Sequence, residues 1–105
     1  MKLNVMERLL LINMLPEKGN AVTLRIVSQL RERLSFTEAD IKKYDIVAEG
    51  EQVRWNIEQA EEEAEIKIGA VAHKVIVDTL TELDTNEELE LQHLSLLDKF
   101  GIGED

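Results

Sequence analysis

The chain has no cysteine, one proline and few aromatic residues, which make up 4% of its 105 positions. Without thiols it can form neither disulfides nor thiolate metal sites. Since 44% of the residues are apolar, we expect a folded core, built mainly from aliphatic side chains. The chain also lacks a signal-peptide pattern at its start and any apolar run near the about 20 residues that span a bilayer. We therefore expect one cytoplasmic domain over residues 1–105.

The motifs that usually carry catalysis or bind cofactors are missing as well. The five glycines are scattered and do not have the spacing of a phosphate-binding loop. His73 and His93 share no motif with each other, whereas a metal site needs three or four converging ligands. We assign both histidines structural or surface roles. The sequence predicts no enzyme, no catalytic residue, no cofactor and no metal.

Positive charge is scarce beyond residue 35. Residues 1–35 hold six Lys and Arg against three Asp and Glu, a net charge of +3, whereas residues 36–105 hold six against nineteen, a net charge of −13. Such an imbalance affects solubility and the choice of partners rather than the fold. The run containing Glu58, Glu61, Glu62 and Glu63 predicts an edge that docks a basic surface of another protein. The alternative is a solvated face that keeps the protein soluble.

Three helices are indicated in the first half of the chain. Asn4 and Glu7 have the spacing of a capping box, and the first helix should end near Leu15, before the only proline. Apolar residues at four-residue steps between positions 22 and 34 predict a second helix. Thr37 has the features of an N-cap for a short third helix that runs to about Tyr44.

The second half begins with a change of period. Val53 and Trp55 alternate with polar residues, as do Ile66 and Ile68, which predicts a small antiparallel sheet of two or three strands with one buried face. A further strand at residues 46–48 would turn at residues 49–50, and residues 57–64 would form a solvated loop. We expect Trp55 in the core, although at the rim of the sheet it would anchor a partner.

Two helices should complete the chain. The first would start at Gly69 and end at residues 84–86, and the second would place Leu94, Leu97 and Phe100 inward. The predicted fold class is α+β: three N-terminal helices, a small antiparallel β-hairpin sheet and two C-terminal helices. The second and third predicted helices, followed by a hairpin, have the element order of a winged helix-turn-helix. A DNA-binding regulator is therefore an alternative. The many carboxylates argue against it, because they repel phosphates.

The first helix is apolar on more than one side, which suggests self-association. Its apolar residues cannot all face one small core, and in a domain of this size the second cover could be another subunit. We place self-association at Leu11, Ile12 and Leu15, in a homodimer. The function predicted from the sequence is that of an acidic, non-enzymatic interaction or assembly protein.

Four segments carry a resemblance to known proteins: residues 17–20 with Leu24, residues 34–41, residues 53–56 and residues 93–100. In these caps and core positions the chain resembles small, uncharacterised proteins encoded by bacterial phages and prophages. The resemblance implies a phage or mobile-element origin, with the host cytoplasm as the location, and no defined activity.

Overall fold

The computed structural model describes residues 1–50, 52–55 and 62–103 and has the α+β fold class expected from the sequence. In chain order its elements are β1 (Lys2–Leu3), α1 (Val5–Met14), α2 (Ala21–Leu34), α3 (Glu38–Lys43), β2 (Val47–Glu49), β3 (Gln52–Arg54), β4 (Ala64–Glu65), α5 (Ala70–Thr85), the 3₁₀ turn η1 (Leu91–His93) and α6 (Leu94–Phe100). The order of helices and hairpin is the predicted one.

The helix ends follow the local signals in the sequence. The side chain of Asn4 accepts a hydrogen bond from the Glu7 N–H at 2.8 Å, and the Glu7 carboxylate accepts one from the Asn4 N–H at 2.9 Å. This reciprocal pair satisfies N–H groups that have no partner within the helix. Thr37 and Asp40 form the same arrangement at the start of α3. Gly101 ends α6 with a φ of 68°, a left-handed conformation that glycine adopts without strain.

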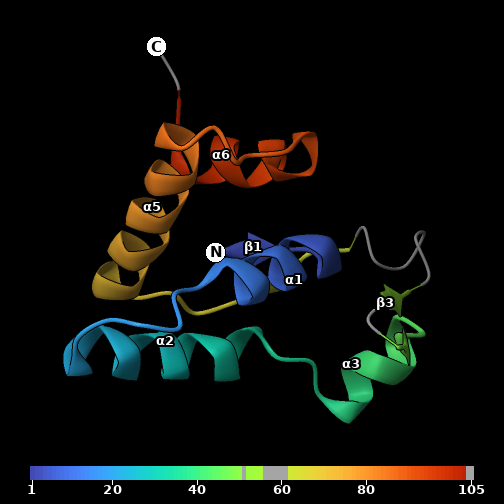
Figure 1. Cartoon of the computed structure of the whole chain (residues 1–105). Coiled ribbons are helices and arrows are strands. Elements are labelled where there is room, and N and C mark those ends of the chain that lie inside the picture. The colour runs from blue at the N-terminus through green and yellow to red at the C-terminus, as the bar shows by residue number, and fades with distance from the viewer. Residues whose placement is uncertain (51, 56–61, 104–105) are drawn as a thin grey trace.

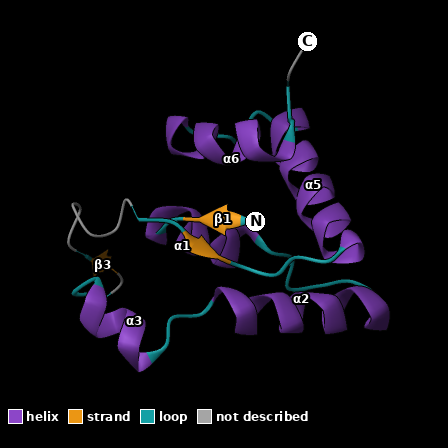
Figure 2. Ribbon diagram, turned by 180° about the vertical axis from the view of Figure 1, so that it is seen from behind, coloured by secondary structure: helices purple, strands orange, loops and turns teal. Residues whose placement is uncertain are grey.

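The main core lies where α1, α2, α5 and α6 meet. In Figure 1, α1 and β1 occupy the middle of the molecule, α2 and α6 lie on opposite sides of them, and α5 closes one end; the view from behind in Figure 2 shows the same arrangement. The most deeply buried aliphatic side chains are Leu3, Leu11, Leu30, Leu34, Ile76, Leu80 and Leu96. As the composition required, the core is almost wholly aliphatic.

The strands form two separate antiparallel pairs, which corrects the prediction of a single sheet. The hairpin β2–β3 turns through Gly50, as expected, and pairs Val47 with Arg54. The segment around Ile66 pairs instead with the start of the chain, Leu3 opposite Ala64. Strand β1 has only two residues, directly before the cap of α1, and so short a segment cannot show a hydrophobic period. The sequence therefore contains no signal for β1.

The hairpin also lacks the buried face that its alternating pattern suggested. All residues of β2 and β3 are exposed, and Trp55, which follows β3, is half-buried. Trp55 packs on a second, smaller cluster centred on Val5 and Tyr44, together with Phe36 and others. This cluster attaches α3 and the hairpin to the flank of α1, and both stand to one side of the helical body (Figure 1).

The last helix is rotated relative to the prediction. Leu94, expected inside, is 52% exposed, whereas Leu96 is fully buried and His93 is buried beside it. Phe100 is buried and Leu97 half-buried, as predicted. The turn η1 precedes α6 without a break and has a tighter winding than an α-helix, so the inward positions shift along the chain.

Candidate interaction surfaces

Only two of the four glutamates proposed as a docking edge lie within the described residues, and both form ion pairs with lysines of this chain. Glu58 and Glu61 lie outside the residues that the structure describes. Glu62 pairs with Lys43 at 2.8 Å, and this hydrogen bond raises the pKa of the Lys43 ammonium. Glu63 pairs with Lys99, and that contact lowers the pKa of the Glu63 carboxyl. Both described glutamates thus link segments of this chain, which reduces their availability to a partner.

Lys99 forms a network with the buried carboxylate of Glu7, which the sequence indicated only as part of a helix cap. Its ammonium donates to Glu7 Oε1 at 2.7 Å, to the Lys2 carbonyl at 2.8 Å and to Glu63. Partial burial opposes the charge on Lys99, but the hydrogen bonds to Glu63 and Glu7 outweigh it and raise the pKa of the ammonium. Glu7 is only 1% exposed, so this network stabilises the fold rather than forming an open site.

The residues proposed for self-association lie in the core of the single chain. Leu11 is fully buried, Leu15 is 3% exposed, and Ile12 is half-buried against the same cluster. Their cover therefore comes from α2, α5 and α6 of the same molecule, and substitution there would test folding rather than an interface. The sequence showed correctly that α1 has two apolar sides but did not show which side faces inward.

The other apolar side of α1 opens into a groove. The groove encloses a volume of about 250 Å³ between α1, the segment from β3 to Trp55, and η1. Its lining consists of Met6, Leu9, Leu10, Asn13, Val53, Trp55 and Gln92. No charged side chain is among these residues, although the chain has a net charge of −10. We call these seven residues the α1 groove.

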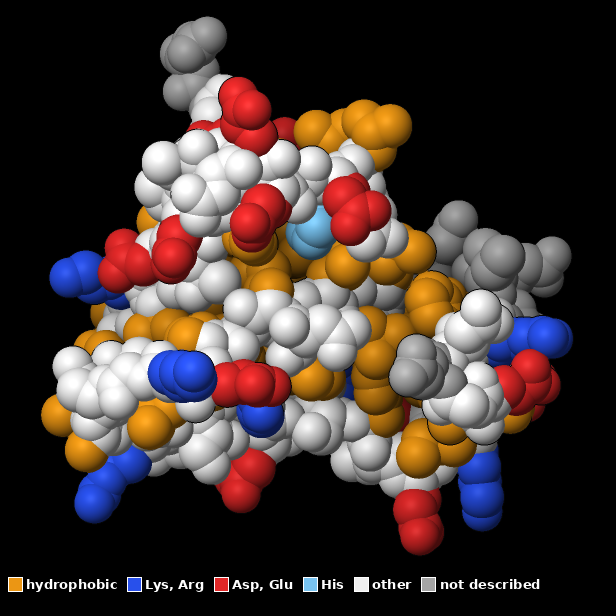
Figure 3. All heavy atoms as spheres, in the orientation of Figure 1, with side chains coloured by type: hydrophobic (Ala, Val, Ile, Leu, Met, Phe, Trp, Pro, Cys, Tyr) orange, Lys and Arg blue, Asp and Glu red, His pale blue; other side chains and the backbone are white. Residues whose placement is uncertain are grey.

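Two exposed leucines lie next to the α1 groove along the chain. Leu91 directly precedes the groove residue Gln92 and is 85% exposed, and Leu94 follows two residues later at 52%. Figure 3 shows apolar side chains gathered in a band between α6, α1 and the hairpin. A hollow with a mixed apolar and amide lining beside an apolar protrusion is a feature of a protein-binding surface.

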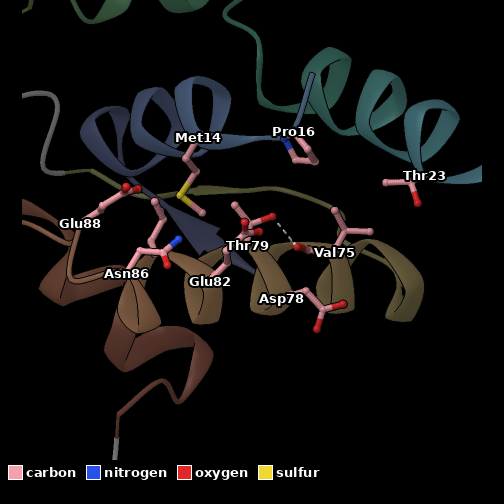
Figure 4. A pocket seen from close by; sticks show the side chains of 10 residues that line it. Met14, Pro16, Thr23, Val75, Asp78, Thr79, Glu82, Asn86 and Glu88 are labelled. Atoms are coloured by element: carbon pink, nitrogen blue, oxygen red, sulfur yellow. Dashed lines mark hydrogen bonds between the residues drawn. The ribbon is translucent and has the colours of Figure 1, made fainter. Parts of the chain in front are cut away.

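A larger pocket lies at the opposite end of α1, against α5 (Figure 4). It has a volume of about 440 Å³, and its lining residues come from the end of α1, the connection to α2, the first turn of α2, α5 and the loop after α5. They include the three carboxylates of Asp78, Glu82 and Glu88. No pattern in the sequence indicates this site, because its residues are spread over positions 14–88.

Helix α3, which would be the DNA-recognition helix of a winged helix, carries as many acidic as basic residues. Helix α3 carries Glu38 and Asp40 in its first turn against Lys42 and Lys43 in its last. Burial opposes ionisation of Asp40, but hydrogen bonds to Thr37 and the charge of Arg8, 3.5 Å away, lower the pKa of this carboxyl. A phosphate approaching α3 would therefore meet ionised carboxylates beside the lysines.

The histidines lie in separate environments. His73 is exposed and its ring centroid is 5.2 Å from that of Phe100. His93 is buried, and its Nδ1 accepts a hydrogen bond from the Glu90 N–H at 2.9 Å. Within residues 1–50, 52–55 and 62–103, no group of three or more potential ligands could hold a metal ion. In the same part of the chain, no helix has both the length and the apolar character needed to cross a membrane.

Comparison of the chain with protein-family models, with curated proteins and with solved structures returns no match. The function is therefore argued from the surfaces of this molecule.

Proposed function

We propose that the protein is a non-enzymatic assembly protein that forms a homodimer through the α1 groove. The observation that carries the proposal is the pairing of a hollow lined by five apolar and two amide side chains with an adjacent apolar protrusion, Leu91, in one chain. The resemblance noted in the sequence supports a phage or prophage origin for such a protein.

A twofold dimer fits this surface better than an unrelated partner. In an isologous interface each copy contributes the same patch, so a protrusion and a hollow on one patch can fill each other twice. Leu91 of one copy would enter the groove beside Trp55 of the second copy, and the reverse. None of the described residues that line the groove is charged, so the two acidic chains can bring these residues together without burying a carboxylate of theirs.

The test is a mass measurement by light scattering or sedimentation over a wide range of protein concentration. We expect the wild-type chain to reach twice its 12.0 kDa, and Leu91→Asp to remain a monomer with an unchanged circular dichroism spectrum. The matched control is Val22→Asp, an equally polar change at a residue of α2 that is 68% exposed and outside the groove. This control should still dimerise.

Two results would contradict the proposal. One is a wild-type chain that stays monomeric at high micromolar concentration. The other is equal dimerisation of Leu91→Asp and Val22→Asp. A monomer that binds duplex DNA with a steep salt dependence would instead support the winged-helix regulator.

A further inference from the structure

The pocket beside α5 combines an apolar floor with a carboxylate rim. Met14, Pro16 and Val75 contribute half-buried apolar surface on its inner side. The hydroxyl of Thr79 donates to the Val75 carbonyl at 2.8 Å, drawn as a dashed line in Figure 4, so its proton is already used and only its oxygen can accept a further hydrogen bond. The floor therefore offers apolar surface to an aliphatic chain and an acceptor, not a donor, at Thr79.

The carboxylates at the rim differ from those elsewhere in the molecule. Glu62 and Glu63 are paired with lysines, whereas Asp78, Glu82 and Glu88 form no ion pair or side-chain hydrogen bond with any residue that the structure describes. Asp78 and Glu82 are four residues apart on α5, where like charges repel. No Lys or Arg is among the residues that line the pocket within the described part of the chain. A cation bound here would relieve this repulsion.

We propose that this pocket receives the side chain of an arginine from a basic segment of another protein. Arginine has an aliphatic stem that can cover the apolar floor and a planar guanidinium whose five donors can bond to more than one carboxylate. Lysine fits the same surface with a single point charge and should bind less tightly. An inorganic cation would make no use of Met14, Pro16 or Val75. The site thus adds a partner of opposite charge to the proposed homodimer.

Charge complementarity favours a basic ligand for this pocket. The chain carries a net charge of −10, so a basic segment is drawn to it before any contact forms. The pocket and the α1 groove share no lining residue, so the binding of arginine and the formation of a dimer can succeed or fail independently.

The test is an NMR titration of the ¹⁵N-labelled chain with a capped pentapeptide that contains one arginine among alanines. The matched probe replaces that arginine by citrulline, which keeps the shape and removes the charge. We expect the arginine peptide to shift the amide signals of Asp78, Thr79, Glu82 and Asn86 at millimolar concentration. The citrulline peptide should leave these signals in place.

A pair of double variants separates a site from general attraction between charges. The variant Asp78→Asn with Glu82→Gln should weaken binding of the arginine peptide about tenfold, the loss expected for charge-assisted hydrogen bonds. The control, Glu38→Gln with Asp84→Asn, changes the net charge equally at exposed residues outside the pocket, and its affinity should stay within about twofold of wild type. Both pairs are near-isosteric, so they should fold.

Three results would overturn the proposal. The arginine peptide could shift signals diffusely over the acidic surface, equally in both double variants. It could shift none in the pocket at millimolar concentration. The citrulline peptide could bind as well as the arginine peptide, which would show that the carboxylates do not select the ligand.

Discussion

Lys99 connects segments that lie far apart in the sequence. Its ammonium contacts Glu7 and Lys2, more than ninety positions away, and Glu63 before β4. Replacing it by Met should cost about 1–3 kcal/mol of folding free energy, because the buried Glu7 carboxylate loses its cation and keeps only the hydrogen bond from the Asn4 N–H. Urea denaturation monitored by circular dichroism measures the loss.

The matched variant for this prediction is Glu7→Gln. The Gln amide oxygen can still accept the hydrogen bond from the Asn4 N–H, but the substitution removes the buried charge that Lys99 neutralises. If the ion pair accounts for the effect, Lys99→Met in the Glu7→Gln background should cost clearly less than in the wild type. Equal costs in both backgrounds would refute it.

The stabilisation from Lys99 should be lost at alkaline pH. Because the folded state raises the pKa of its ammonium, its contribution to stability is fully present below the pKa of the unfolded chain, about 10.4. The contribution is lost as pH rises through the higher folded pKa. The melting temperature of the wild type should therefore fall more steeply above about pH 10 than that of Lys99→Met. Parallel falls would argue against the assignment.

At the scale of single elements, helix α3 depends on its cap. None of its six residues is buried, so the packing that holds it comes from the flanking residues Phe36 and Tyr44 rather than from the helix itself. Thr37→Ala removes the side-chain acceptor of the Asp40 N–H and should cost about 1 kcal/mol. Hydrogen exchange should speed up in α3 while the amides of α2 and α5 keep their protection. Thr37→Ser retains the hydroxyl and should restore slow exchange in α3.

The elements that the sequence predicted well are those with chemistry at their ends. Four helix boundaries lie at the capping residue that the sequence indicated: Asn4, Thr37, Gly69 and Gly101. The pairing of β1 with β4 was missed, because it joins residues more than sixty positions apart and neither strand is long enough to show a period. The inward face of α1 was missed for a different reason: both of its sides are apolar, and only the packing of α2, α5 and α6 decides between them.

The candidate sites were harder to predict than the helices. The glutamates at 58 and 61–63 predicted a docking edge because they lie close together in the sequence, yet Glu62 and Glu63 have lysine partners from distant segments. Conversely, Asp78, Glu82 and Glu88 are spread over α5 and its following loop and gain significance only from the apolar residues that the fold places beside them. Charge density along a sequence does not show which charges are neutralised in the folded molecule.

For the whole molecule, the net charge of −10 makes the two proposed interactions respond to salt in opposite directions. Two like-charged chains repel, so dimer formation should strengthen when the Debye length falls from about 10 Å at 0.1 M salt to about 3 Å at 1 M. Binding of the arginine peptide should weaken over the same range. Sedimentation equilibrium and the peptide titration, repeated at both salt concentrations, measure the two trends. A dimer that dissociates at high salt would contradict an interface with an uncharged lining.

The contact between Glu7 and Lys99 also constrains when the molecule can fold during synthesis. Until Lys99 has left the ribosome, the Glu7 carboxylate lacks the ammonium that neutralises it in the folded molecule, so packing that buried this group would leave it without a countercharge. Nascent chains that end before α6 should therefore remain open and sensitive to proteases, and the native state should form only after release of the C-terminal helix.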